Sequence, residues 1–263
     1  MPLLSLKNVT KRFGGLVAVN GVDLALEEGD LAGLIGPNGA GKTTVFNLLT
    51  GVYEPSEGEL LFDGVSLSGK KPHEIARLGI GRTFQNIRLF AELTVLDNVR
   101  TAASTREKIG LFDSIVRTPR FDRVEASTTK EARRLLSLLG LADVEGELAK
   151  NLPYGDQRRL EIARALATGP KLLLLDEPAA GMNPQESEDL MHLIRRLRDE
   201  FGVTILLIEH DMNVVMGVCE KITVLVYGQP VAHGTPDEIR ANPKVIEAYL
   251  GTSAEDEGTP DDA

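Results

Sequence analysis

The feature that most constrains this chain is a glycine-rich turn between an apolar segment and a helix. Residues 31–51 read LAGLIGPNGAGKTTVFNLLTG. The apolar run 31–35 predicts a buried strand, and Lys42 begins a helix that Gly51 can end. The spacing G-x-x-x-x-G-K-T between a strand and a helix is the P-loop motif. It indicates an α/β fold built on a P-loop core.

The loop has the composition of a phosphate site. Its glycines let backbone N–H groups point into the concavity of the loop, and the N-terminus of the following helix adds positive potential there. We expect Lys42 to bind the β- and γ-phosphates of a nucleotide, as one of the catalytic residues, and the Thr43 hydroxyl to bind Mg²⁺. A glycine-rich turn can serve backbone geometry alone, but the lysine and threonine after the last glycine favour nucleotide binding. The predicted nucleotide contacts in the loop are Gly36, Asn38, Gly39, Ala40, Gly41, Lys42, Thr43 and Thr44.

A second apolar segment ends in two carboxylates. Residues 171–177 read KLLLLDE, and four consecutive leucines suit a strand that is buried on both faces of a parallel sheet. Asp176 and Glu177 then lie at the C-terminal edge, where open α/β sheets bind their ligands. We expect Asp176 to bind Mg²⁺ through water and Glu177 to polarise the water that attacks the γ-phosphate. Strand-end carboxylates without this chemistry are the alternative, which the P-loop makes the weaker one.

A third apolar segment, residues 203–208, is followed by Glu209, His210 and Asp211. A lone histidine at a strand end is more often a structural group than a catalytic one. Here two neighbouring strands already bring phosphate and Mg²⁺ ligands to the same edge. We therefore predict that His210 contacts the γ-phosphate.

Composition narrows the classes of function. The length of 263 residues fits one α/β domain with an inserted lobe. No apolar stretch reaches the roughly 18 residues of a spanning helix, and the N-terminus lacks the pattern of a signal peptide, so a cytoplasmic location is expected. The single cysteine, Cys219, is predicted to lie in the core. The net charge of −10 argues against nucleic-acid binding, although half of it comes from the acidic tail 251–263, which we expect to be disordered.

These motifs together resemble those of the ATP-binding subunits of ABC transporters, from Leu4 to about Leu250. The resemblance makes LLLLDEP the Walker B strand, with Glu177 as the catalytic base. It makes Gln85, in RTFQN, the glutamine of the Q-loop, and His210 the switch histidine. Gln85 and His210 thereby join the predicted catalytic residues.

The resemblance also implies the cofactors ATP and Mg²⁺ and two further contacts. Phe13, in KRFGG, matches the aromatic residue that stacks on adenine. A surface aromatic side chain at a strand end is the alternative for this position. Gln85 joins Thr43 and Asp176 as a Mg²⁺ ligand. Because the chain has one P-loop, two ATP sites require two chains.

Residues 151–157, NLPYGDQ, occupy the position of the family's signature, a loop that faces the γ-phosphate of ATP bound to a partner ATPase. Gly155 is then a nucleotide contact in trans. The usual pattern, LSGGQ, is altered here, because Pro153 replaces the serine and Asp156 replaces the last glutamine. What remains is the Gly155 N–H and the dipole of a helix expected to begin near Gln157. We therefore expect a weaker contribution of this half-site to ATP-driven closure.

The domain boundaries follow from these landmarks. Two stretches of short strands, 1–30 and 58–68, predict an antiparallel sheet beside the nucleotide. Residues 106–134 carry eight basic and five acidic residues, which suits a solvated helix face or contact with a partner or lipid headgroups equally well. The predicted units are an ATP-binding domain 1–250, its mostly parallel core and antiparallel β subdomain in 1–85 and 156–250, its α-helical subdomain in 86–155, and the tail 251–263.

Within the family, the segments RLFAELTVLDNVRTAAS and GTPDEIRANPKVIEAYLG are similar to those of LivG-type ATPases of branched-chain amino-acid importers. The implied partners are a second ABC ATPase, either LivF-like or another copy of this chain, and two integral-membrane permeases. An external substrate-binding protein would act indirectly. The chain would then be a peripheral protein on the inner face of the cell membrane.

Residues 86–93, just after the Q-loop, are expected to line a groove that receives a coupling helix of a permease. Arg88, Leu89 and Phe90 are the candidates, and packing of Leu89 and Phe90 inside the lobe is the alternative. Two other functions stay open. One is an ABC ATPase for another cargo, such as urea, amides or an exported lipid, and the other is a soluble ABC ATPase that does not transport.

Overall fold

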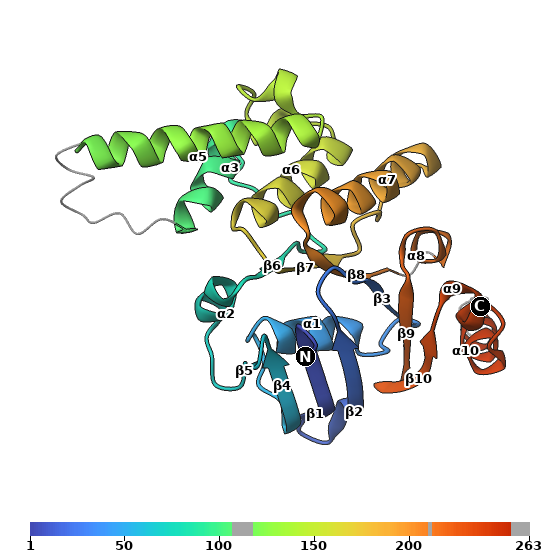
Figure 1. Cartoon of the computed structure of the whole chain (residues 1–263). Coiled ribbons are helices and arrows are strands. Elements are labelled where there is room, and N and C mark those ends of the chain that lie inside the picture. Colours follow the sequence, from blue (N-terminus) through green and yellow to red (C-terminus); the bar gives the residue numbers. More distant parts are fainter. Residues whose placement is uncertain (107–117, 210–211, 254–263) are drawn as a thin grey trace, which may run out of the picture.

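The computed structural model describes residues 1–106, 118–209 and 212–253, which form two β-sheets and a set of covering helices (Figure 1). The larger sheet has six strands in the order β10-β9-β3-β8-β7-β6. Its strands are β3 Leu31–Ile35, β6 Ile80–Arg82, β7 Leu172–Asp176, β8 Thr204–Ile208, β9 Lys221–Val226 and β10 Gln229–Gly234.

The middle of this sheet is parallel, because β3 pairs with β8 and β9, and β7 pairs with β6 and β8, all in the same direction. Strands β3, β7 and β8 are buried at every position. The three apolar segments predicted as strands are therefore confirmed. In register, Ile208 lies opposite both Leu34 and Asp176, so the strands end at nearly the same level. The segments that follow them consequently meet at one edge.

The smaller sheet is antiparallel, with the order β2-β1-β4-β5, as predicted. Its strands are β1 Leu4–Phe13, β2 Leu16–Leu26, β4 Glu57–Phe62 and β5 Val65–Ser66. Helix α1, Lys42–Leu49, lies between the two sheets (Figure 1). Phe46 of this helix packs with Leu4 of the small sheet and with Leu172 and Leu174 of the large one in a single apolar cluster.

The opposite face of the large sheet is covered by helices. Leu173 and Leu175 point to this side and belong to a second cluster, which includes residues from the helices above the sheet. The alternation of four leucines between two cores explains why β7 has no polar residue before Asp176. The helices are α2 Pro72–Leu78, α3 Val95–Ala103, α5 Pro119–Leu138, α6 Tyr154–Ala167, α7 Pro184–Phe201, α8 Met212–Val218, α9 Pro236–Arg240 and α10 Pro243–Ser253, with short 3₁₀ turns at Ser104–Arg106, Ala142–Val144 and Ala149–Asn151.

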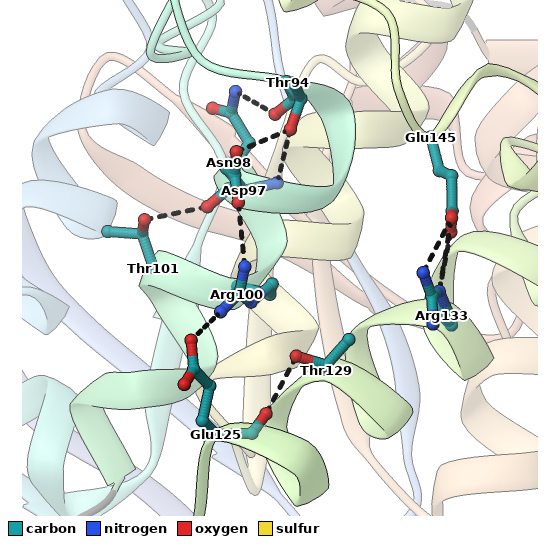
Figure 2. Close-up of polar contacts among 9 residues, drawn as sticks. All are labelled: Thr94, Asp97, Asn98, Arg100, Thr101, Glu125, Thr129, Arg133 and Glu145. Atoms are coloured by element: carbon teal, nitrogen blue, oxygen red, sulfur yellow. Dashed lines mark hydrogen bonds and ion pairs between the residues drawn. The ribbon is translucent and has the colours of Figure 1, made fainter. Parts of the chain in front are cut away.

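Helices α3, α5 and α6 pack together above the sheet (Figure 1). The apolar face of α5 consists of Ala132, Leu135 and Leu136, which are buried together with Leu139 at the C-cap. On the outer side, Arg100 of α3 forms ion pairs with Asp97 at 3.1 Å and with Glu125 of α5 at 2.8 Å (Figure 2). Arg133 of α5 binds the carboxylate of Glu145 through two nitrogens (Figure 2). These contacts join the helices into one lobe.

Two predictions change at the element ends. Helix α6 begins at Tyr154, not near Gln157. The reason is that Pro153 occupies the N-cap, where its φ of −55° leads into the helix and its missing N–H leaves no donor unpaired. At the C-terminal end, α10 continues to Ser253, three residues into the segment predicted as a tail. Residues 254–263 lie outside the described residues, as do 107–117 of the basic segment.

Two other expectations are met. Cys219 is buried between α8 and β9, and burial raises the pKa of its thiol to about 12, so it is a core residue. In the described parts of the chain, every helix is either too short or too polar to cross a lipid bilayer.

Candidate nucleotide site

The P-loop is shaped by glycines at positions that other residues could not fill. A Cβ atom on Gly36 would lie 2.1 Å from the carbonyl oxygen of Leu225, and one on Gly41 would lie 2.5 Å from that of Ala18. Both glycines have positive φ angles, of 152° and 97°. Gly39 also has positive φ, but a Cβ there would meet nothing within 4 Å. The two ends of the loop therefore pack tightly against β9 and β2, and its tip at Gly39 is open.

Lys42 lies inside this loop. Its ammonium donates hydrogen bonds to the carbonyl oxygens of Gly36 at 2.5 Å and Pro37 at 2.9 Å. Burial lowers the pKa of Lys42, and the nearby charges of Glu177 and Asp176 oppose that change. The start of α1 and the end of β7 therefore place the buried Lys42 ammonium near the carboxylates of Asp176 and Glu177.

Asp176 ends β7 and is almost completely buried. Its Oδ2 atom accepts a hydrogen bond from Nη2 of Arg82 at 2.8 Å, and its backbone N–H donates to Oγ1 of Thr83 at 3.2 Å. Both partners come from the neighbouring strand, β6, or its end. Sequence reasoning missed Arg82, because its partner Asp176 lies 94 positions away and no local pattern links the two.

Glu177 follows Asp176 and has the left-handed φ of 47°, which is unusual for a residue with a side chain. Its backbone N–H donates to the carbonyl oxygen of Ile208 at 2.9 Å. Its Oε2 atom accepts a hydrogen bond from Nε2 of Gln85 at 3.0 Å. The structure thus brings together two of the predicted catalytic residues that are 92 positions apart. His210 lies outside the described residues.

Phe13 lies at the end of β1, before the turn to β2, and is 40% exposed. Its ring makes an edge-to-face contact with Tyr53, with centroids 5.0 Å apart, and the Lys11 ammonium lies 5.0 Å from the Phe13 centroid. Phe13 is thus a half-exposed aromatic residue at a strand end, which is the alternative given for this position, and its stacking on adenine stays a prediction. Lys11 lies two positions before Phe13 on β1 and so on the same face of the strand. Sequence reasoning missed Tyr53 as a neighbour of Phe13, because β2, β3 and α1 lie between them in the sequence.

The signature helix α6 holds the Q-loop through a buried ion pair. Arg158 and Glu161 lie 3.0 Å apart on α6, with side chains 2% and 5% exposed. Arg158 donates to the carbonyl oxygens of Phe84, at 2.6 Å, and Gln85. Glu161 accepts from the backbone N–H groups of Phe84 and Arg88, each at 3.3 Å. Burial raises the pKa of Glu161, and the Arg88 N–H and the Arg158 guanidinium oppose the rise.

Sequence reasoning missed this pair. The available signal was a charged R-x-x-E spacing inside a helix whose other residues are mostly apolar. Such a pair on α6 could equally have been a solvent-exposed i,i+3 contact. Only the burial of both side chains distinguishes the two cases.

The start of α6 lies beside the start of α7. Tyr154 is 46% exposed, and a Cβ on Gly181 would lie 3.3 Å from its ring. A Cβ on Gly155 would lie 3.6 Å from Oε1 of Glu186. Asn183 caps α7 by accepting from the Glu186 N–H at 3.0 Å, and Pro184 takes the first helical position. The altered signature therefore forms an exposed helix start, with Gly155 in the first turn.

A groove of about 580 Å³ opens between α2, α3 and α6. Arg88 and Phe90 line it, whereas Leu89 packs against the helical core. Arg88 and Phe90 therefore line a groove as expected, whereas Leu89 follows the alternative of packing inside the lobe. Alternation along an extended segment explains the difference, because successive side chains point to opposite sides. Binding of a permease helix in this groove stays a prediction. Arg164 of α6 covers Phe90, with 4.6 Å between its guanidinium carbon and the ring centroid.

The donor set at this edge fits Mg²⁺. The predicted ligands are a hydroxyl from Thr43, an amide oxygen from Gln85 and a carboxylate from Asp176. Mg²⁺ takes oxygen ligands, keeps several waters and needs only one or two carboxylates when phosphates complete its shell. Within the described ranges, no group of three or more His, Cys, Asp or Glu side chains could hold a metal ion. A Mg²⁺ ion at this edge would therefore need the phosphates of the nucleotide as further ligands.

Comparison with known proteins places this arrangement in a family. The family model described as "ABC transporter" matches residues 19–180, and that described as "Branched-chain amino acid ATP-binding cassette transporter" matches residues 229–255. The high-affinity branched-chain amino acid transport ATP-binding protein LivG of Escherichia coli strain K12 is 51% identical over 95% of this chain and 98% of its own length. BraF of Pseudomonas aeruginosa, described in the same words, is 50% identical over the same shares.

A solved structure agrees with these relatives. The ATP-binding cassette MJ1267 of an ABC transporter, in its ADP conformation, matches with a TM-score of 0.81 and 32% identity. The match covers 95% of this chain and 99% of that one. The P-loop between two sheets, the paired Gln85 and Glu177, the signature helix and these similarities lead to one conclusion: the chain belongs to the ATP-binding subunits of ABC transporters, in the group that contains LivG and BraF.

Proposed function

We propose that this chain is the ATP-hydrolysing subunit of an importer of branched-chain amino acids. The observation that carries the ATPase part is the meeting of the P-loop, Asp176, Glu177 and Gln85 at one edge of the large sheet. The names of LivG and BraF and the match of residues 229–255 support the cargo.

In the proposed reaction, the P-loop holds ATP. The N–H groups around Gly39 and Gly41 and the Lys42 ammonium bind the phosphate oxygens. Thr43, Gln85 and Asp176 would hold Mg²⁺, Asp176 through water. The bound ion would offset the charge of the phosphates. Glu177 accepts a proton from the attacking water as the bond to the γ-phosphate forms and ADP leaves.

The remaining site residues position these groups. Gln85, which contacts Glu177, orients the carboxylate and reports the state of the site through the Q-loop. His210 contacts the γ-phosphate in this proposal, and Phe13 stacks on adenine beside Tyr53. The exposure of Phe13 leaves its ring accessible to a base.

A second ATPase completes the site. Helix α1, which follows the P-loop, packs on one face of the large sheet, and α6 packs on the other. The signature therefore suits a nucleotide bound to a partner, either a LivF-like ATPase or a second copy. Gly155 would donate its N–H there, and Pro153 removes the hydroxyl that the usual pattern offers. Restoring serine at position 153 should tighten ATP-dependent association with the partner, and an unchanged binding titration would contradict this.

The groove beside α6 suits a permease. Its lining mixes apolar side chains with the guanidinium groups of Arg88 and Arg164, which would bind a short helix with an acidic or polar end. The chain would thus work as a peripheral protein on the inner face of the membrane, under two permeases served by an external binding protein. Residues 86–155 would form the helical subdomain that carries this contact, beside the core in 1–85 and 156–250.

The test uses transport in cells. Strains carry either this gene or its Glu177→Gln form as the only copy, in a background without other leucine importers. Uptake of labelled leucine, isoleucine and valine should be lost in the variant, while urea uptake is unchanged. Normal leucine uptake in the variant would refute the proposal that branched-chain amino acids are the cargo. Loss of urea uptake instead would favour another importer, and a defect in neither would favour an ATPase that does not transport.

A further inference from the structure

Arg82 is a buried arginine that the proposed reaction does not use. Its side chain is 8% exposed, and it pairs at 2.8 Å with Asp176, whose side chain is 4% exposed. Removing two charges from water carries a large desolvation penalty, and well-packed apolar residues often stabilise a fold as well as a buried pair does. A buried pair is therefore weak evidence for a purely stabilising role. The contact of Arg82 with Asp176, the carboxylate proposed to hold Mg²⁺, indicates a functional role.

The guanidinium is fixed from several directions. Nη1 donates to Oδ1 of Asn47 at 2.8 Å and to Oγ1 of Thr50 at 3.2 Å, both at the C-terminal end of the P-loop helix. Nη2 donates to Asp176. The guanidinium carbon also lies 5.6 Å and 5.1 Å from the ring centroids of Phe46 and Phe84. Because the guanidinium is planar and rigid, these contacts set the orientation of the nitrogen that faces Asp176.

We propose that Arg82 is the positioning residue for Asp176. It fixes the rotation of the carboxylate through Oδ2 and so determines the affinity of the site for a divalent cation. This inference rests on the proposed function, which makes Asp176 a Mg²⁺ ligand through water. Partners that orient a metal ligand typically change metal affinity or activity by about 10- to 100-fold when they are removed.

The same residue connects two parts of the molecule. Arg82 lines the groove between α2, α3 and α6, together with Phe84. A helix that enters this groove would therefore contact the side chain that holds Asp176. This connection runs through β6 to the metal-binding carboxylate, whereas the contact of Gln85 runs to Glu177.

The experiment measures cation binding directly. The full chain carries Glu177→Gln so that ATP is not consumed, and Mn²⁺ is titrated in the presence of ATP while free Mn²⁺ is followed by electron paramagnetic resonance. Arg82→Gln should weaken Mn²⁺ binding by about 10-fold or more. Binding of ATP without a divalent cation should change less than twofold. Arg198→Gln is the matched control. It removes the ion pairs of Arg198 with Asp199 and Glu220, which lie at the end of α7 and before β9, away from the P-loop.

Two further variants separate the possible failures. Asp176→Asn should weaken Mn²⁺ binding at least as much as Arg82→Gln. If Asp176→Asn has no effect, both the ligand assignment and the role of Arg82 are wrong. If Asp176→Asn weakens binding and Arg82→Gln does not, only the role of Arg82 is wrong.

Arg82→Lys covers the case in which the glutamine variant does not fold, as judged by its thermal unfolding. Lysine keeps the charge but has a single nitrogen, so it cannot bind Asn47 and Asp176 with the geometry of the guanidinium. Its Mn²⁺ affinity should lie between those of the parent and the glutamine variant. Parent-like Mn²⁺ affinity in the folded lysine variant would overturn the positioning role.

Discussion

Replacing Glu161 with alanine should lower the free energy of unfolding by about 3–5 kcal/mol, because it leaves the Arg158 guanidinium buried without its counter-ion. The structure supplies the reasons for a value in this range. The two side chains lie 3.0 Å apart and are 2% and 5% exposed, so solvent cannot replace the lost charge. The change also removes the acceptor of the Phe84 and Arg88 N–H groups. Since domains are stable by only about 5–15 kcal/mol, the loss would be readily measured.

The assay is urea unfolding of the full chain, followed by circular dichroism, together with hydrogen exchange of the amides of residues 84–88. Exchange there should speed up in the variant, because α6 no longer holds these groups. Glu145→Ala is the matched control. It removes the carboxylate that Arg133 binds through two nitrogens (Figure 2), but the side chains of Glu145 and Arg133 are 34% and 58% exposed. An exposed pair of this kind should contribute less than about 1 kcal/mol.

Glu161→Gln provides the graded case, because the amide keeps the shape and one acceptor oxygen but not the charge. The decrease in its free energy of unfolding should lie between those of Glu161→Ala and Glu145→Ala. A loss below about 1 kcal/mol for Glu161→Ala, or equal losses for Glu161→Ala and Glu145→Ala, would refute the account of the pair as a buried clamp on the Q-loop.

Three shorter predictions follow. Gly41→Ala should abolish ATP binding in a filter or fluorescence assay, because the new Cβ would lie 2.5 Å from the carbonyl oxygen of Ala18; normal affinity would refute the tight packing. Asn183→Ala should lower the free energy of unfolding by about 1 kcal/mol in urea melts, through loss of its cap on the Glu186 N–H, and no change would show that the cap is dispensable. Cys219 has a thiol pKa of about 12 and should resist iodoacetamide at pH 8 until urea unfolds the chain; rapid native labelling would contradict its burial.

Local structure could be predicted where its cause is local. A run of apolar residues predicts the strand before the P-loop. Asparagine followed by proline is a local pattern of the same kind and is typical of a helix start such as that of α7. The start of α6 lies three residues before the predicted one, because Pro153 is the N-cap of the helix as well as a residue without an N–H donor. Leu89 and Phe90 could not be assigned to opposite sides, since both are apolar and only the packing of the lobe distinguishes them.

The sequence by itself determined the fold class, the P-loop, the two carboxylates after β7 and the position of the signature, because each depends on residue types at short, fixed spacings. The tertiary structure alone decided which side chains meet. Arg82 reaches Asp176 across 94 positions, and Arg158 reaches Phe84 across 74. Such contacts depend on strand order and helix packing, and the sequence near either partner contains no record of them. The proposed control of the metal-binding carboxylate therefore became visible only in three dimensions.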